Sequence, residues 1–121
     1  MNGLFCGCFD LEEVNLINFD TGNVENFNQM FLNCFNLNEI KGLEKFIGSK
    51  AKTCSEMFRF CKSLKEINIS NFDLRNATDI KQMFYFCLNL RGVIGLEKLN
   101  TSKVENISYM FGDCRKIHRF F

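Results

Sequence analysis

The chain repeats itself every 26 or 27 residues from one end of the sequence to the other. A Met-Phe pair recurs at residues 30–31, 57–58, 83–84 and 110–111, and Leu4-Phe5 takes its place in the first repeat. A cysteine stands three residues after each of these phenylalanines, at Cys8, Cys34, Cys61, Cys87 and Cys114. A period of this length indicates that the repeats stack on one another, because a single repeat cannot bury its own apolar side.

The step between equivalent residues alternates between 26 and 27. Val14 and Leu16 are separated by one residue, whereas Ile40 and Leu43 are separated by two. The extra residue lies beside Gly42, and the arrangement recurs 53 residues later at Gly95. Because glycine accepts a bulge or a tight bend at low steric cost, we expect a local bulge in every second repeat.

Each repeat is predicted to contain a short strand and a short helix. Residues 11–16 and 64–69 carry branched apolar residues in near alternation, the pattern of a strand with one buried face. The apolar residues of segment 24–34 would share an arc of about 120° on a helix. Turns rich in Asn, Asp, Thr and Gly at 18–23 and 71–76 join strand to helix.

The fold expected from this pattern is an α/β leucine-rich-repeat solenoid, with a parallel β-sheet on one face and short helices on the other. We expect about four to five stacked coils within one domain that spans residues 1–121. The expected repeats cover approximately 4–29, 30–56, 57–82 and 83–109, followed by a partial repeat at 110–121.

The repeat resembles that of the BspA-type leucine-rich-repeat surface proteins, in the class with a repeat of about 26 residues. The pattern N-F-D-T-x-N-V-x-N-M-x-x-M-F-x-x-C-x-x-L-x-x-I-x-L of that class is similar to residues 18–43, and parts of it recur at 71–73 and 100–106. The core M-F-x-x-C-x-x-L occurs four times if Ile117 counts as leucine. The resemblance implies an adhesion or protein-interaction module at the cell surface or outside the cell.

Composition and charge argue against several classes of partner. The 15 Lys and Arg nearly balance the 14 Asp and Glu, and a net charge of +1 removes the usual electrostatic case for nucleic acid. No apolar run approaches the roughly 18 residues of a membrane span. The first ten residues lack the basic and apolar regions of a secretory signal peptide, so a cytoplasmic location is the alternative to the surface or secreted one.

The 7 cysteines raise the question of disulfides and metals. The five repeated thiols are expected to form a buried column of free side chains, although a strand spacing of roughly 4.8 Å lies within the range of disulfide Cα separations. Paired C-x2–4-C zinc ligands are absent, so no metal site is predicted. Cys6 has no place in the repeat, which leaves a terminal metal or lipid role as an alternative for it.

No catalytic site is predicted. His118 is the only histidine, and it has no Ser or Cys partner at a spacing typical of a catalytic triad. A glycine-rich phosphate-binding loop is also absent. We therefore expect that the chain is not an enzyme and needs no cofactor.

Two surfaces are candidates for partner binding. The first is the predicted sheet face, which carries Glu13, Asn15, Glu39, Lys41, Glu66, Asn68 and Ile94. Its stacked carboxylates would repel one another unless Lys41, Lys65, water or a calcium ion intervened. The second is a flank patch of aromatic residues that otherwise cover the seams between repeats, formed by Phe35, Phe60, Tyr85 and Phe86.

The expected function is that of a non-catalytic protein-interaction or adhesion module, which binds a protein or another cell-surface polymer on its sheet face. The alternative is a self-assembling structural protein. Solenoids normally carry polar capping repeats, and neither end of this chain shows one, so the open ends could pair into a homo-oligomer. The dependence of particle size on concentration distinguishes these two functions.

Overall fold

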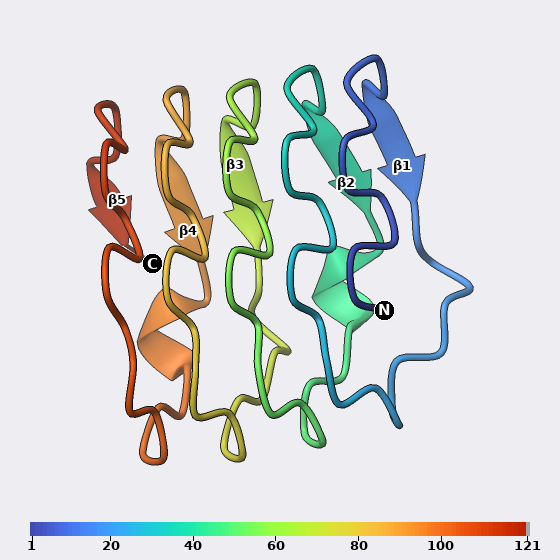
Figure 1. Ribbon diagram of the computed structural model, residues 1–121, viewed down its shortest axis with the longest axis vertical. Helices are drawn as coiled ribbons and strands as arrows, with labels where there is room; N and C mark the ends of the chain where they lie inside the picture. The colour runs from blue at the N-terminus through green and yellow to red at the C-terminus, as the bar shows by residue number, and fades with distance from the viewer. Residues whose placement is uncertain (121) are drawn as a thin grey trace.

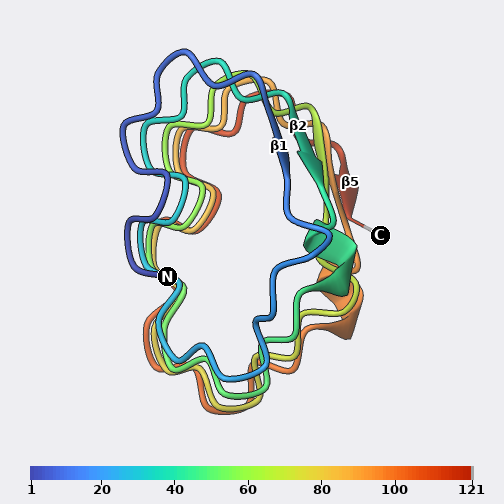
Figure 2. The same cartoon turned by 90° about the vertical axis from the view of Figure 1, so that its right-hand side faces the viewer.

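The computed structural model describes residues 1–120, in which successive repeats lie side by side and follow nearly the same path (Figure 1). Each repeat contributes one short strand: β1 (Glu13–Asn15), β2 (Glu39–Lys41), β3 (Glu66–Asn68), β4 (Gly92–Ile94) and β5 (Arg119–Phe120). Viewed along the row of repeats, the paths nearly superpose into one outline with the strands on one side (Figure 2).

The strands pair in parallel and in the register of the sequence repeat, but they form two sheets. β1 pairs with β2, so that Val14 lies opposite Ile40. β3 pairs with β4 and β4 with β5, so that Ile67 lies opposite Val93 and Val93 opposite Phe120. β2 and β3 are neighbours in the row, yet they are not hydrogen-bonded to each other. The strand side of the molecule is therefore interrupted in its middle.

The helices predicted for residues 24–34 and their equivalents are wrong. No α-helix occurs in residues 1–120, and these segments form successive tight turns. Within a repeat, the N–H of Met30 donates to the carbonyl of Phe27, and that of Cys34 to the carbonyl of Phe31, at 3.3 and 3.1 Å. Between repeats, the N–H of Phe31 donates to the carbonyl of Met57 at 2.9 Å. Backbone donors therefore alternate between bonds within a repeat and bonds to the next one.

Two residues of each repeat adopt a left-handed backbone conformation that an α-helix cannot contain. In the second repeat these are Gln29 (φ 56°) and Asn33 (φ 63°), four residues apart. The first repeat has Gly3 and Gly7 at the equivalent positions, also with positive φ. Because the chain reverses its twist at every fourth residue, the apolar residues that would have lined one helical face are buried from a series of turns instead.

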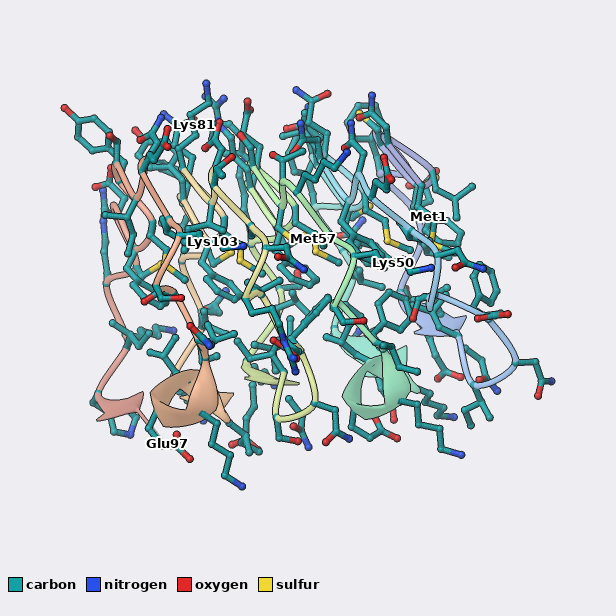
Figure 3. All side chains as sticks on the ribbon, turned by 90° about the horizontal axis from the view of Figure 1, so that it is seen from below. Met1, Lys50, Met57, Lys81, Glu97 and Lys103 are labelled. Atoms are coloured by element: carbon teal, nitrogen blue, oxygen red, sulfur yellow. The ribbon has the colours of Figure 1, made fainter. Side chains whose placement is uncertain are left out.

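The side chains that the repeat aligns fill the interior. The ring of Phe58 is fully buried and stacks on Phe31 and Phe84, with centroids 5.5 and 5.4 Å apart and interplanar angles of 6°. The Cys61 thiol donates to the carbonyl of Phe31 in the preceding repeat at 3.2 Å. All cysteines are free thiols, and sulfur atoms lie inside the molecule beside the buried Met57 (Figure 3). The expected cysteine column is thus part of the core.

Gly42 and Gly95 account for the alternating step length. Both have φ 89° and each precedes a single 3₁₀ turn, η1 (Leu43–Lys45) or η2 (Leu96–Lys98). A Cβ atom on Gly42 would lie 2.6 Å from the backbone nitrogen of Ile17, so only glycine lets the bulged repeat contact its predecessor this closely. These two turns are the only helices in residues 1–120, and neither is long and apolar enough to span a bilayer.

Candidate binding surface

The predicted sheet-face residues occupy the positions that flank the inward-pointing residue of each strand. They are Glu13 and Asn15 on β1, Glu39 and Lys41 on β2, Glu66 and Asn68 on β3, and Ile94 on β4. The glutamates are exposed, whereas the central residue of β3, Ile67, is buried. The two-residue alternation of strands therefore brings these side chains to one face.

The carboxylates of this face are only partly neutralised. The Lys41 ammonium lies 3.1 Å from the Glu13 carboxylate, and this hydrogen-bonded contact, reinforced by Glu39, raises the pKa of Lys41. Among the described side chains, neither Glu39 nor Glu66 has a cation within ion-pair distance. Lys65 was expected to compensate them and makes no ion pair there. Two unpaired negative charges remain at the centre of the face.

A groove lies where the two sheets face each other. It has a volume of about 170 Å³ and is lined by Asn38, Glu39, Ile40, Leu64, Glu66, Ile67, Asn68 and Ile94, which we call the β2–β3 groove. Four predicted residues line it: Glu39, Glu66, Asn68 and Ile94. Glu13, Asn15 and Lys41 lie outside it. Sequence reasoning missed the groove itself and its apolar floor of Ile40, Leu64 and Ile67.

Charge explains why the ladder is interrupted between these two strands. The register of the other strand pairs, applied to β2 and β3, would place Glu39 directly opposite Glu66. Glu39 also lies opposite Glu13, but there Lys41 bridges to Glu13, and Glu66 lies opposite the neutral Gly92. Like charges directly opposite each other destabilise a strand pair. In the described part of the chain, only β2 and β3 would bring two carboxylates together without a cation.

The groove presents backbone hydrogen-bonding groups as well as side chains. The carbonyl of Lys41 accepts a bond from the β1 side, and the N–H of Ile69 donates toward β4. Because successive residues of a strand direct their N–H and C=O groups to opposite neighbours, Ile40 on β2 and Glu66 and Asn68 on β3 direct theirs into the groove. No backbone bond crosses the groove between the two strands.

The predicted flank patch is a continuous aromatic cluster. The ring of Phe60 contacts those of Tyr85 and Phe86, with centroids 6.0 and 5.1 Å apart. Phe35 lies apart from these three, and Lys62 connects it to them because its Nζ is 4.6 Å from the Phe35 ring and 5.9 Å from the Phe86 ring. The structure thus brings all four residues into one surface with a lysine between them.

Further members of this cluster were missed. Phe9 stacks on Phe35 at 5.0 Å, and the guanidinium of Arg59 lies 4.9 Å from the Phe60 ring while pairing with Glu56 at 2.6 Å. Phe9 stands 26 residues before Phe35 in the same repeat column, so extending the column alignment by one position would have found it. Because its cations are engaged by its own rings and by Glu56, the cluster serves chiefly to pack the seams between repeats.

The side chains that could carry chemistry are buried or isolated. Burial raises the pKa of the Cys54 thiol to about 12 and that of Cys114 to about 11, which makes both poor nucleophiles at neutral pH. His118 is exposed, with its Nδ1 2.9 Å from the carbonyl of Lys116. Residues 1–120 contain no cluster of three or more metal-ligating side chains. The exposed Cys6 remains outside every repeated column.

Comparison with known protein families identifies the repeat array. Residues 1–120 match the family described as "Mycoplasma protein of unknown function, DUF285". No curated protein and no solved structure matches the chain. Since the match covers all but the last residue, the chain belongs to the DUF285 family.

Proposed function

We propose that this protein is a non-catalytic binding module, which recognises a protein partner on the strand side of a leucine-rich-repeat solenoid. The observation that carries the proposal is the β2–β3 groove, which combines an apolar floor, two unpaired carboxylates and free backbone groups. The regular face of a row of repeats offers an extended surface of this kind. The resemblance to BspA-type proteins supports a role in adhesion at the cell surface.

The strand side is better suited to a partner than the aromatic flank. On the flank, Arg59 and Lys62 lie over the rings of their own chain, and Arg59 also pairs with Glu56. In the β2–β3 groove, Glu39 and Glu66 are negatively charged and have no cation near them among the described side chains. A partner that brings opposite charges therefore gains more at the groove than on the flank.

Selection from a phage library of random twelve-residue peptides tests this proposal. We expect the selected peptides to bind the native protein, and to bind at least about tenfold more weakly after the double substitution Glu39→Arg/Glu66→Arg, which reverses the charge of the groove. The matched control is Glu97→Arg/Glu105→Arg, which changes exposed residues outside the groove and should leave binding intact. Selected peptides that bind both variants equally well would overturn the assignment to the strand side.

A second candidate function is self-assembly through the outer faces of the end repeats. Leu4 is 48% exposed and Ile107 is 56% exposed, whereas the equivalent residues Met30 and Ile80 of inner repeats are fully buried. Either another copy or further repeats of a longer chain would cover these faces. Light scattering of the 121-residue chain should show a mass that grows with concentration, and Leu4→Lys/Ile107→Lys should abolish the growth. A constant monomeric mass would exclude self-assembly of this chain.

A further inference from the structure

We propose that the β2–β3 groove binds an extended peptide segment rich in lysine or arginine, which pairs through its backbone with the facing edges of both β2 and β3. This inference rests on the proposed binding function and specifies the chemical class of the ligand and its mode of binding. It follows from three properties of the groove: its backbone groups, its shape and the position of its charges.

The backbone groups favour an extended chain as the ligand. Ile40 presents an unpaired N–H and C=O on one wall of the groove, and Glu66 and Asn68 present theirs on the other. A row of such groups along a strand edge is the surface to which an extended peptide adds as a further strand. Since both walls belong to parallel sheets, one segment lying parallel to them can satisfy both edges.

The rest of the molecule holds the groove in place while leaving its walls apart. On the opposite side of the same two repeats, the N–H of Phe27 donates to Thr53 and that of Phe31 to Met57, at 3.0 and 2.9 Å. The repeats are therefore joined at the turns and separated at the strands. The volume of about 170 Å³ equals that of about six water molecules in the liquid, which an entering backbone would displace.

The side chains specify the composition of the segment. The floor consists of Ile40, Leu64 and Ile67, and the outer rim carries the carboxylates of Glu39 and Glu66. In an extended segment, alternate side chains point to opposite faces. One set would therefore contact the apolar floor, and the other would reach the two carboxylates. Alternating valine and lysine satisfies both requirements.

The first test uses a defined probe, the fluorescein-labelled peptide Lys-Val-Lys-Val-Lys-Val with blocked termini, titrated by fluorescence anisotropy. We expect saturable binding that weakens with added salt, because screening reduces the attraction between exposed charges. A peptide with N-methyl groups on alternate amides should bind about tenfold more weakly or worse, because it lacks the donors for one edge. The Glu-Val counterpart should not bind.

Two protein variants test the role of the rim. Glu39→Gln/Glu66→Gln removes both carboxylates without adding bulk and should weaken binding of the Lys-Val peptide about five- to tenfold. Glu97→Gln/Glu105→Gln makes the same change in net charge away from the groove and should leave binding unchanged. Equal affinities of the two variants would show that the rim does not select the ligand.

Amide hydrogen exchange locates the bound peptide. In the free protein, the amides of Ile40, Glu66 and Asn68 should exchange faster than that of Ile67, which faces β4. Saturating Lys-Val peptide should slow exchange of all three by at least about tenfold. Slow exchange of these amides in the free protein, or protection of only one wall by the peptide, would overturn the proposal.

The outcomes separate this inference from the proposed function. Phage-selected peptides that bind the strand side, tolerate N-methylation and leave the three amides unprotected would refute strand addition and preserve the binding module. Failure of the Lys-Val peptide to bind at millimolar concentration would refute the predicted ligand class. If no peptide is selected and no probe binds, both proposals fail.

Discussion

The stacked phenylalanine column makes a quantitative prediction about coupling between repeats. Phe31 stacks on Phe5 and Phe58, and Phe58 stacks on Phe31 and Phe84, at centroid distances of 5.3 to 5.5 Å. Replacing either Phe31 or Phe58 by leucine keeps an apolar side chain but removes two stacked pairs. Replacing Phe5, which stacks only on Phe31, removes one.

The expected losses follow from the number of pairs. An aromatic pair contributes about 0.5–1.5 kcal/mol beyond the burial of its surface. Phe31→Leu and Phe58→Leu should therefore each cost about 1–3 kcal/mol from stacking, and Phe5→Leu about half as much. The double variant Phe31→Leu/Phe58→Leu removes three pairs, because the two rings share one. Its loss should fall short of the sum of the single losses by about 0.5–1.5 kcal/mol.

Urea unfolding followed by circular dichroism measures all four free energies. Misfit of the leucine side chain adds a cost to each single substitution, but this cost cancels in the double-mutant cycle. The slope of the unfolding free energy against urea should stay constant across the variants, which confirms that they unfold in the same way. A coupling energy of zero, or a loss for Phe5→Leu equal to that for Phe58→Leu, would refute the view that neighbouring rings stabilise one another.

Three further predictions concern glycine and cysteine positions. Gly42→Ala should lower the free energy of unfolding by about 2 kcal/mol or more, since alanine combines an unfavourable left-handed φ with a contact of 2.6 Å to the preceding backbone. Gly22→Ala, whose nearest contact would be 3.4 Å, is the control and should cost less. Iodoacetamide should label the exposed Cys6 in the native protein and the fully buried Cys87 only after unfolding, as peptide mass mapping will show; rapid native labelling of Cys87 would contradict the buried column. Stability should fall as the pH rises above about 9, because unfolded thiols then ionise whereas burial raises the pKa of Cys54 to about 12 and keeps it protonated. This thiol alone should contribute about 1.4 kcal/mol per pH unit, so Cys54→Ala should show a shallower decline in urea midpoint between pH 9 and 11, and an unchanged slope would count against the argument.

The repeat period was enough to predict which residues meet. Columns 26 or 27 residues apart place Phe31 against Phe58 and Val14 opposite Ile40, whatever local structure lies between. The helices were mispredicted because apolar spacing alone does not distinguish a helical face from a series of turns. The contrary signal was the pair Gly3 and Gly7, which stand four residues apart in columns where the chain requires positive φ.

The binding surface was predicted in part. Alternation along the strands correctly assigned Glu39 and Glu66 to one face, because side-chain direction follows from residue parity. The interruption between β2 and β3 was not foreseen, since periodicity treats every junction between repeats alike. What distinguishes this junction is the particular pair of residues that meet there: Lys41 is already engaged by Glu13, and no cation is left for the other two carboxylates.

The alternation of bulged and unbulged repeats limits how such a chain can lengthen. Gly42 sits against the backbone of an unbulged predecessor, and Gly95 does the same 53 residues later. Duplicating a single repeat would place two bulges, or two unbulged turns, next to each other and break this fit. Duplicating a pair of repeats copies both partners of the contact. Gene variants of different length should therefore differ by multiples of 53 codons.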